Sequence, residues 1–215
     1  MRIYLSFFIL IFTTSTSFSQ GLRLNVYGHY VFDDKVESYS SSTNYFNGTI
    51  KGGLLWGGGM EFRIHHYYGV ELLYLHQNTT VPLHYYDIPA GSEKSPTLDM
   101  SINWVLAGGV RTERVNEKVE GYAGFLLGVA ILDAHNPDNE KSNSATKFAW
   151  GMKAGCNIWM SEKVGIKLQA QLLSAVQAAG GSLYVGTGGT GGGVTGYSSM
   201  LQFSLGGGVC FRLRD

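Results

Sequence analysis

Charged and amide side chains recur at alternate positions along this chain, and their types and spacing make them its strongest candidates for chemistry. They are Arg23, Glu61, Arg63, Glu71, Asn103, Arg111, Glu120, Lys153, Lys167 and Gln169. Acids and bases interleaved in this way predict a network of ion pairs, because an isolated buried charge is costly. Such a network can act as a structural plug that satisfies its own charges, or it can line a gated path for ions and small solutes.

Enzymatic chemistry has weaker support in the sequence. A lipid hydrolase or acyltransferase would need a serine, a histidine and a carboxylate held together. His76, Asp133 and His135 fall near one end of the expected strands, but no His-x-Ser motif stands on a strand and the nearby serines fall in expected loops. We therefore predict no catalytic residues and a protein that is not an enzyme, with a lipid-modifying enzyme as the least favoured alternative.

Metal and cofactor sites are not expected either. His65 and His66 are adjacent and have no evident third ligand, which favours a polar turn over a metal site. The glycine-rich run 186–193 lacks the Gly-Lys-Ser/Thr ending of a phosphate-binding loop, so we predict a mobile surface loop. Cys156 and Cys210 are expected on opposite faces of their strands, which argues against a disulfide.

The elements that must position these side chains are strands. Eight stretches alternate apolar and polar residues, and side chains alternate between the two faces of a strand. They cover 22–32, 53–64, 67–77, 98–111, 119–132, 145–160, 164–176 and 197–213. They reach the roughly 9–11 residues that a tilted transmembrane strand needs, whereas ordinary strands average about 5–6.

The stretch 98–111 shows the alternation best, with Trp104 on its apolar face and Asn103 and Arg111 on its polar face. Across the strands, the charged residues gather on the polar faces. A soluble barrel has an apolar interior, whereas a membrane barrel has an apolar exterior and a polar interior. We therefore expect the apolar faces, including Trp104, to meet lipid and the polar network to lie in the lumen.

The connections between the strands alternate in length. Long ones at 33–51, 79–97, 133–144 and 180–196 alternate with short turns near 65–66, 115–118 and 162–163. Outer-membrane barrels have short periplasmic turns and long extracellular loops, and closure leaves no open edge in lipid. We predict an all-β, eight-stranded antiparallel transmembrane β-barrel. Because side chains fill the interior of a barrel of this size, we favour the structural plug over the pore.

Aromatic residues fall near both expected rims of the barrel. Amphipathic rings prefer the two membrane interfaces. We expect this interfacial position for Tyr30, Tyr67, Tyr74, Trp150, Trp159 and Phe211.

Composition and the N-terminus agree with an exported membrane protein. The chain has 215 residues, a formal net charge of +0 and only 15% charged residues, against roughly 25% in soluble domains. This balance argues against nucleic acid as a partner. Residues 1–19 combine a basic start, a short apolar core and a Ser-Phe-Ser ending, which predicts a cleaved signal peptide before a barrel domain at 20–215.

The strand pattern, the Gly-aromatic stretch 54–62 and the aromatic Phe211 near the C-terminus resemble the small eight-stranded outer-membrane barrels of the OmpA/OmpX type. The pattern is most similar to the barrel-domain proteins of Bacteroidetes-like bacteria. The resemblance implies a location in the bacterial outer membrane and recognition by the barrel-assembly machinery, which reads a terminal aromatic. Here Arg212, Leu213, Arg214 and Asp215 follow Phe211, so that signal is displaced from its usual position.

The function that we predict is structural or surface-interacting and non-enzymatic, with no cofactor. The long loops, rich in Tyr, Ser, Asn and Gly, would be the contact surface, since binding residues concentrate on loops over a rigid scaffold. Expected partners are outer-membrane lipid or lipopolysaccharide, the assembly machinery, and a surface ligand or envelope protein. A narrow, porin-like channel is the main alternative.

Overall fold

The computed structural model describes residues 21–41, 44–87, 92–94, 97–137, 141–176 and 200–214. The predicted signal peptide and the glycine-rich run 186–193 lie outside the described residues. Within the described part of the chain, no helix is long and apolar enough to cross a membrane.

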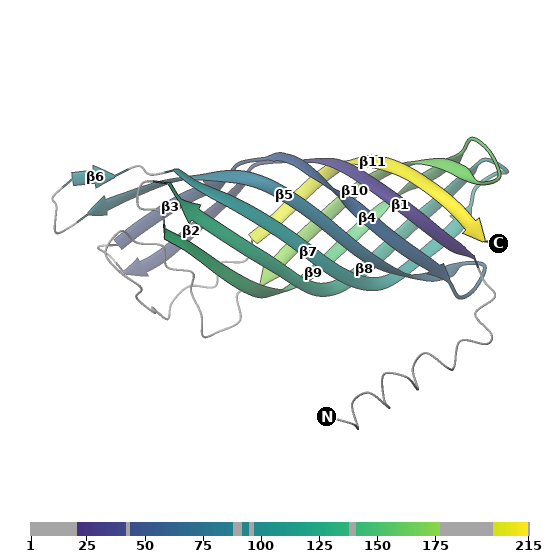
Figure 1. The fold of residues 1–215 in the computed structure, drawn as a ribbon, viewed down its shortest axis with the longest axis horizontal. Helices are drawn as coiled ribbons and strands as arrows, with labels where there is room; N and C mark the ends of the chain where they lie inside the picture. The colour runs from purple at the N-terminus through teal and green to yellow at the C-terminus, as the bar shows by residue number, and fades with distance from the viewer. Residues whose placement is uncertain are drawn as a thin grey trace, which may run out of the picture.

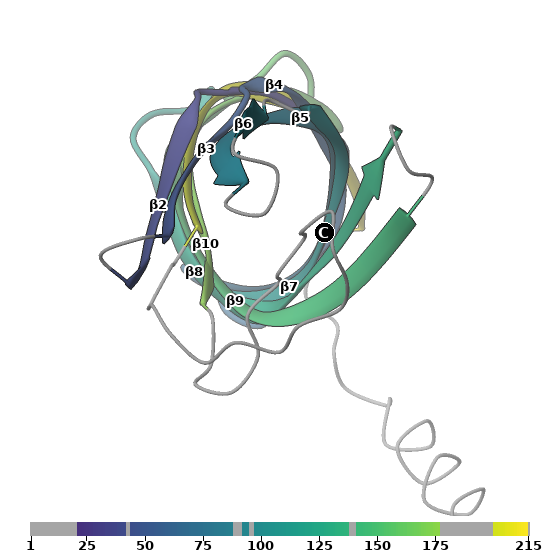
Figure 2. The same cartoon turned by 90° about the vertical axis from the view of Figure 1, so that its left-hand side faces the viewer.

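Eight strands form one closed antiparallel barrel, as the alternation predicted (Figures 1 and 2). Neighbours in the chain pair around the barrel, and β11 closes it on β1 with Leu22 opposite Arg214. The barrel strands are β1 (Leu22–Val31), β4 (Gly53–Arg63), β5 (Tyr68–Asp87), β7 (Thr97–Arg114), β8 (Val119–Asn136), β9 (Lys141–Trp159), β10 (Val164–Val176) and β11 (Met200–Arg214).

The two ends of the barrel differ. We call the end that carries the tight connections 64–67, 115–118 and 160–163 the turn end, and the opposite one the loop end. The start of β1 and the end of β11 both lie at the turn end (Figure 1). This is the arrangement that an even number of antiparallel strands requires.

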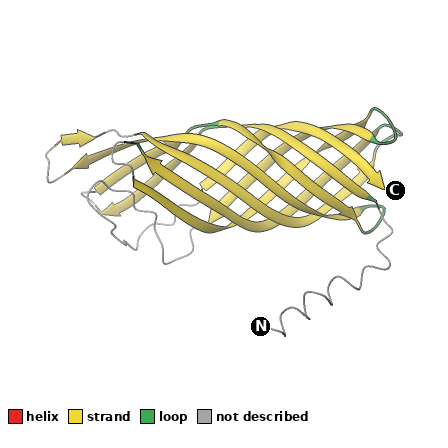
Figure 3. Cartoon of the chain, in the orientation of Figure 1, coloured by secondary structure: helices red, strands yellow, loops and turns green. Residues whose placement is uncertain are grey.

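At the loop end, strands continue where we expected loops (Figure 3). The predicted loop 33–51 contains a hairpin of β2 (Asp34–Ser41) and β3 (Asn44–Ile50), and the predicted loop 79–97 contains the end of β5 and the short β6 (Ser92–Lys94). The prediction of plain loops is therefore wrong for these segments. An antiparallel hairpin outside the membrane needs no apolar face, because water can solvate both of its faces. Its sequence then need not alternate between apolar and polar residues, and the alternation used to predict the barrel strands is not available.

The outer surface is apolar and the lumen is packed. Outward side chains such as Leu54, Trp56, Leu72 and Phe125 are about half exposed, because nothing within the chain covers them. The side chains at the intervening positions of each strand point the other way and are buried in the lumen. An exposed apolar band around a closed barrel is the surface that lipid covers.

On β7 the predicted orientation is wrong. Trp104 is fully buried and stands opposite Leu75 of β5 and Ala130 of β8, which are also fully buried. Directly opposed residues of antiparallel strands share a face. The apolar face of β7 therefore lines the lumen, and Asn103 and Arg111 lie on the outer face.

Candidate functional site: the lumen and the loop-end surface

A cluster of buried ions, the ion cluster, fills the lumen toward the turn end. It consists of Arg23, Glu61, Glu71, Glu120, Lys153 and Lys167, with Arg63 at its edge. Arg23 joins its pairing partner on β4 to an acid across the lumen on β8: its Nη1 lies 3.5 Å from Glu61 Oε1 and 3.1 Å from Glu120 Oε2. Glu61 Oε2 also lies 3.7 Å from Lys167 Nζ, and Arg63 Nη1 lies 3.7 Å from Glu120 Oε1.

The second centre of the ion cluster is Glu71. Its carboxylate accepts hydrogen bonds from the Tyr27 hydroxyl at 2.5 Å, from Asn25 Nδ2 at 3.2 Å and from Lys153 Nζ. The ammonium of Lys167 lies 4.6 Å from the ring centroid of Tyr122, within cation–π range. Every fully buried ion in this cluster therefore has an opposite charge or an aromatic face beside it, as burial of charge requires.

The structure places most residues of the predicted network together. Gln169 lies just above the ion cluster: its Oε1 accepts from the Tyr122 hydroxyl at 2.8 Å, and its Nε2 donates to Gln171 Oε1 at 2.7 Å. The sequence analysis missed Asn25, Tyr27 and Tyr122 as partners of these ions. The available signal was their parity, because each stands two or four residues from a predicted luminal charge.

Two members of the predicted network are not luminal. Arg111 points outward, where its guanidinium lies 3.6 Å from exposed Glu113 and over the ring of Tyr68. Asn103 also points outward, and its Oδ1 accepts from the Tyr74 hydroxyl at 2.9 Å. Both side chains point outward because the apolar face of β7 lines the lumen.

An apolar layer fills the lumen between the ion cluster and the loop end. Its largest members are Leu55, Leu75, Ile102, Trp104 and Leu126, all of them fully buried. They come from β4, β5, β7 and β8, and they belong to one continuous buried cluster. The lumen thus has two stacked layers, one charged and one mainly apolar.

Within the apolar layer lie polar atoms that have no hydrogen-bond partner among the described residues. They are His29 Nδ1, Gln77 Nε2 and Oε1, Trp104 Nε1, Gln171 Nε2, Gln202 Nε2 and Oε1, and Ser204 Oγ. Each unsatisfied buried group costs roughly 1–3 kcal/mol.

The predicted interface aromatics divide into two groups. Tyr30, Tyr67, Tyr74 and Phe211 are exposed on the outer surface, and Trp150 stacks outward on Phe125 with 6.3 Å between ring centroids.

Trp159 does not belong with the interface aromatics. Its Nε1 donates to Glu120 Oε2 at 3.1 Å, and the Arg212 guanidinium lies 3.9 Å from its ring centroid. The interfacial position predicted for Trp159 is therefore wrong, because the ring faces the ions at the mouth of the lumen.

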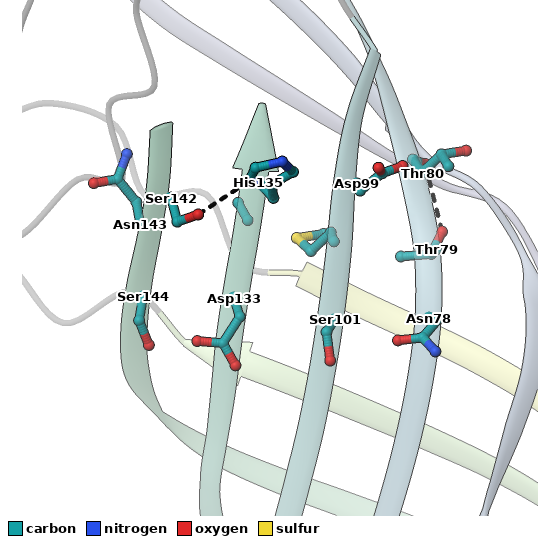
Figure 4. A pocket seen from close by; sticks show the side chains of 12 residues that line it. Asn78, Thr79, Thr80, Asp99, Ser101, Asp133, His135, Ser142, Asn143 and Ser144 are labelled. Carbon is teal, nitrogen blue, oxygen red and sulfur yellow. Dashed lines mark hydrogen bonds between the residues drawn. The ribbon is translucent and has the colours of Figure 1, made fainter. Parts of the chain in front are cut away.

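A concave surface lined mostly by polar residues lies on the outer face of the barrel near the loop end, over β5, β7, β8 and β9 (Figure 4). It encloses about 650 Å³. Two neighbouring rows of side chains form much of it: Thr80, Asp99, His135 and Ser142, and below them Asn78, Ser101, Asp133 and Ser144. We call it the outer concavity.

The outer concavity brings a serine and a histidine together, which the sequence analysis did not expect. His135 Nδ1 lies 3.0 Å from Ser142 Oγ, across the β8–β9 pair. Asp99 is the pairing partner of His135 on the other side, yet no carboxylate of the described residues hydrogen-bonds this imidazole. His76 is engaged elsewhere, with Nδ1 2.8 Å from Asn103 Oδ1.

The loop-end rim is tied to the barrel by two acidic residues, Asp33 and Asp34, that follow β1. Asp33 accepts a hydrogen bond from the Gly52 backbone N–H at 2.7 Å and another from Lys51 Nζ at 3.2 Å. These bonds, the backbone one above all, lower the pKa of Asp33. Burial raises the pKa of Asp34, although its Oδ2 accepts from the Leu201 N–H at 2.9 Å.

Among the described residues, no group of three or more His, Cys, Asp or Glu side chains is arranged to bind a metal ion. His65 and His66 lie exposed in a turn, with their rings edge to face. Cys156 and Cys210 are free thiols.

No family model matches the chain, and no curated protein is similar to it in sequence. Solved structures do match in fold. The outer membrane protein OprG from Pseudomonas aeruginosa superposes with a TM-score of 0.58 and 8% identity, over 92% of this chain and 97% of that one. The Neisserial surface protein A, NspA, gives a TM-score of 0.54 and 13% identity, over 89% of this chain and 97% of that one.

The protein is a transmembrane β-barrel. This follows from the closed barrel, its exposed apolar band and the shared fold. The outer membrane protease OmpT from Escherichia coli shares the fold as well, with a TM-score of 0.56 and 6% identity over 91% of this chain and 97% of that one. Because identities are this low, the similarity establishes the fold and leaves the activity to the chain's own residues.

Proposed function

We propose that this outer-membrane barrel does not conduct, is not an enzyme, and acts as a structural or surface-interaction protein through its loop end. The observation that carries the proposal is the filled lumen. The ion cluster occupies the turn-end half with side chains such as Arg23 and Lys167, which are at most 1% exposed, and the apolar layer occupies the rest. A continuous aqueous path would need both layers to open.

Planar-bilayer recording tests this proposal directly. The refolded chain 20–215 is inserted as a heat-modifiable, folded barrel, and single-channel current is measured. We expect no steady conductance. Steady conductance that changes when Glu61 is replaced by Gln would overturn the proposal, because Glu61 lies in the ion cluster.

Arg111→Gln is the matched control for this recording. It also neutralises one charge, but on the outer face of β7. A current altered equally by both variants would reflect surface charge, whereas a current altered only by Glu61→Gln would support the narrow, gated channel that remains the main alternative.

The contact surface that we infer combines the extended loop-end strands with the outer concavity. The concavity offers hydroxyl, amide, carboxylate and imidazole groups on a rigid sheet, which suits hydrogen bonding to a polar partner. Its position above the apolar band favours contact with outer-leaflet lipid or lipopolysaccharide, or with a ligand or envelope protein at the cell surface. The assembly machinery is a further expected partner, through the outward Phe211. We also propose, from the similarity of its strand pattern, that the protein is related to the barrel-domain proteins of Bacteroidetes-like bacteria.

One observation favours a second candidate, an outer-leaflet lipid enzyme: the contact between His135 and Ser142. A serine nucleophile needs a base that is itself oriented by a third group. Fatty-acid release from phospholipid vesicles by the refolded barrel, abolished by Ser142→Ala and unchanged by Ser144→Ala, would establish this activity. We expect no release from either variant or from the parent chain.

A further inference from the structure

One side of the outer surface changes from polar to apolar over a few residues. It is formed by β5, β7, β8 and β9, whose outward side chains pair in rows across the four strands. From the loop end toward the turn end, the five rows are Thr80, Asp99, His135 and Ser142; Asn78, Ser101, Asp133 and Ser144; His76, Asn103, Ile131 and Thr146; Tyr74, Val105, Val129 and Phe148; and Leu72, Ala107, Leu127 and Trp150. The first two rows belong to the outer concavity (Figure 4), and the last two belong to the apolar band.

The middle row, which contains His76, Asn103, Ile131 and Thr146, is the boundary row between the two regions. Outward residues that follow one another on a strand are about 6.7 Å apart, or about 5 Å along the membrane normal when the strand is tilted. The headgroup region adds roughly 5–8 Å to each side of the hydrocarbon core. The outer concavity therefore begins at the depth of the lipid headgroups, directly beside the surface that acyl chains cover.

Hydrogen bonds organise the boundary row. The Tyr74 hydroxyl donates to Asn103 Oδ1 at 2.9 Å, and His76 Nδ1 lies 2.8 Å from the same oxygen. Because an amide oxygen only accepts, His76 Nδ1 must carry the proton. The N–H groups of Asn103 then remain to donate and His76 Nε2 remains to accept. Both suit a polar headgroup better than an acyl chain.

The charge of the outer concavity is negative. Asp99 and Asp133 are exposed, and Asp99 pairs with His135, which stands two residues from Asp133 on β8. Diagonal neighbours of this kind are about 7–8 Å apart, so one cation can lie between the two carboxylates. Among the described residues that line the concavity, none is a lysine or an arginine. The surface therefore attracts a cationic group and disfavours a headgroup rich in phosphate.

The remaining lining groups are hydrogen-bonding and uncharged. Ser101 stands opposite Asp133 and Asn78 stands opposite Ser101, so a hydroxyl and an amide lie beside the acids in the same row. Hydroxyl and amide groups can donate to the oxygens of a phosphodiester or an ester. The volume of the concavity, about 650 Å³, is in the range of small-ligand sites.

We propose that this face binds a membrane lipid whose headgroup ends in a primary ammonium; the proposal rests on the proposed role of the outer concavity as a contact surface. The ammonium lies between Asp99 and Asp133. The linkage to the glycerol accepts hydrogen bonds from Ser101 and Asn103, and the acyl chains follow the apolar rows past Leu127. A lipid fits better than a soluble amine, because the polar and apolar rows form one continuous surface.

Native mass spectrometry of the refolded barrel tests the proposal. The protein is released from detergent micelles that contain equal amounts of phosphatidylethanolamine, phosphatidylcholine and phosphatidylglycerol with identical acyl chains. The first two lipids carry the same charges, but only the ethanolamine ammonium can donate hydrogen bonds. We expect phosphatidylethanolamine to be retained roughly fivefold over phosphatidylcholine, which corresponds to about 1 kcal/mol, and phosphatidylglycerol to be retained least.

Asp99→Asn combined with Asp133→Asn removes both charges and keeps the shape of the side chains. Both positions are exposed, so the double variant should fold, and it should retain the two zwitterionic lipids equally. Glu113→Gln is the matched control. It also neutralises an exposed acid on the outer face of β7, but at the turn end, and should leave the preference unchanged.

Any of four results would overturn this lipid site. They are equal retention of phosphatidylethanolamine and phosphatidylcholine by the parent chain, a preference that persists in the double variant, a preference for phosphatidylglycerol, and binding of soluble phosphoethanolamine as tight as that of the lipid. Conductance is measured in a separate experiment. Loss of the lipid site therefore leaves a non-conducting barrel standing, whereas steady conductance would overturn the proposed function without changing the lipid preference.

Discussion

Lys153 Nζ donates a hydrogen bond to Glu71 Oε2 inside the lumen, although the two residues come from β9 and β5, which do not pair with each other. Both side chains are at most 1% exposed. The contact therefore links two walls of the barrel through its interior, and it does so with a pair of opposite charges that water does not reach. Its effect on stability depends on whether one partner or both are removed.

Removing one partner of this pair should destabilise the barrel strongly. Lys153→Met leaves the Glu71 carboxylate buried with its Tyr27 and Asn25 hydrogen bonds but without its ammonium. Loss of one partner in a buried pair costs about 3–5 kcal/mol. Urea unfolding of the refolded barrel, followed by its heat-modifiable gel mobility, measures the change in the free energy of unfolding.

The double variant Lys153→Met with Glu71→Leu should recover most of that loss, because no uncompensated charge remains. A double variant as unstable as the sum of the two single variants would show that the residues act independently. That result would contradict the ion pair.

Arg23 and Arg111 should differ sharply when each is replaced by Gln. Arg23 is fully buried between two acids, whereas the Arg111 and Glu113 side chains are 61% and 69% exposed. Exposed ion pairs contribute about 0–1 kcal/mol, so Arg111→Gln should change the free energy of unfolding by no more than that. Arg23→Gln should cost several times as much, by about 3–5 kcal/mol. If both variants lowered the free energy of unfolding equally in the same urea titration, Arg111 would have to be buried in the lumen, contrary to the structure.

This contrast shows how far the sequence could predict the site. Period-two alternation separates the two faces of every strand, and on most strands the charged face marks the interior correctly, as at Glu61 and Lys167. Alternation alone does not say which face is inside. On β7 the interior is apolar, because Trp104 belongs to the apolar layer, and the rule that charge points inward gave the wrong orientation.

Trp159 and the hairpin of β2 and β3 are two further features that the sequence alone did not predict. An aromatic at a rim can face lipid or the ions of the mouth, and only its contact with Glu120 in the folded chain distinguishes the two. The hairpin lies beyond the apolar band, where neither face needs to be apolar. The Trp159 contact joins residues far apart in the sequence, whereas the hairpin pairs neighbouring segments that need no amphipathic pattern.

Protection of the β2–β3 hairpin should depend on pH through Asp33. Its pKa is lowered below the ordinary 3.8, chiefly by the Gly52 N–H and also by Lys51, so the folded state favours the carboxylate. The resulting stabilisation is present above pH 3.8 and is lost as pH falls through the lower pKa of the folded state. Hydrogen–deuterium exchange of residues 34–50, corrected for intrinsic rates, should show protection that decreases in that acid range.

Asp33→Asn is the control for this dependence. It cannot ionise, so its protection should be lower than that of the parent chain at neutral pH and should lose the acid transition. If the protection factors of the parent chain stayed constant through the acid range, Asp33 would not stabilise the loop-end rim.

Lipid-borne quenchers should distinguish Trp104 from Trp150, which tests the orientation of β7 directly. Each tryptophan is kept alone, with the other three replaced by Phe, and the folded barrel is placed in bilayers with brominated acyl chains. Trp150 lies on the outer surface and should be quenched, whereas Trp104 is fully buried in the lumen and should keep its emission. Trp104→Ala should also cost about 3–5 kcal/mol, as large-to-small changes in a packed interior do. Strong quenching of Trp104 in a folded barrel would show that it faces lipid, and would reverse the assignment of every side chain on β7.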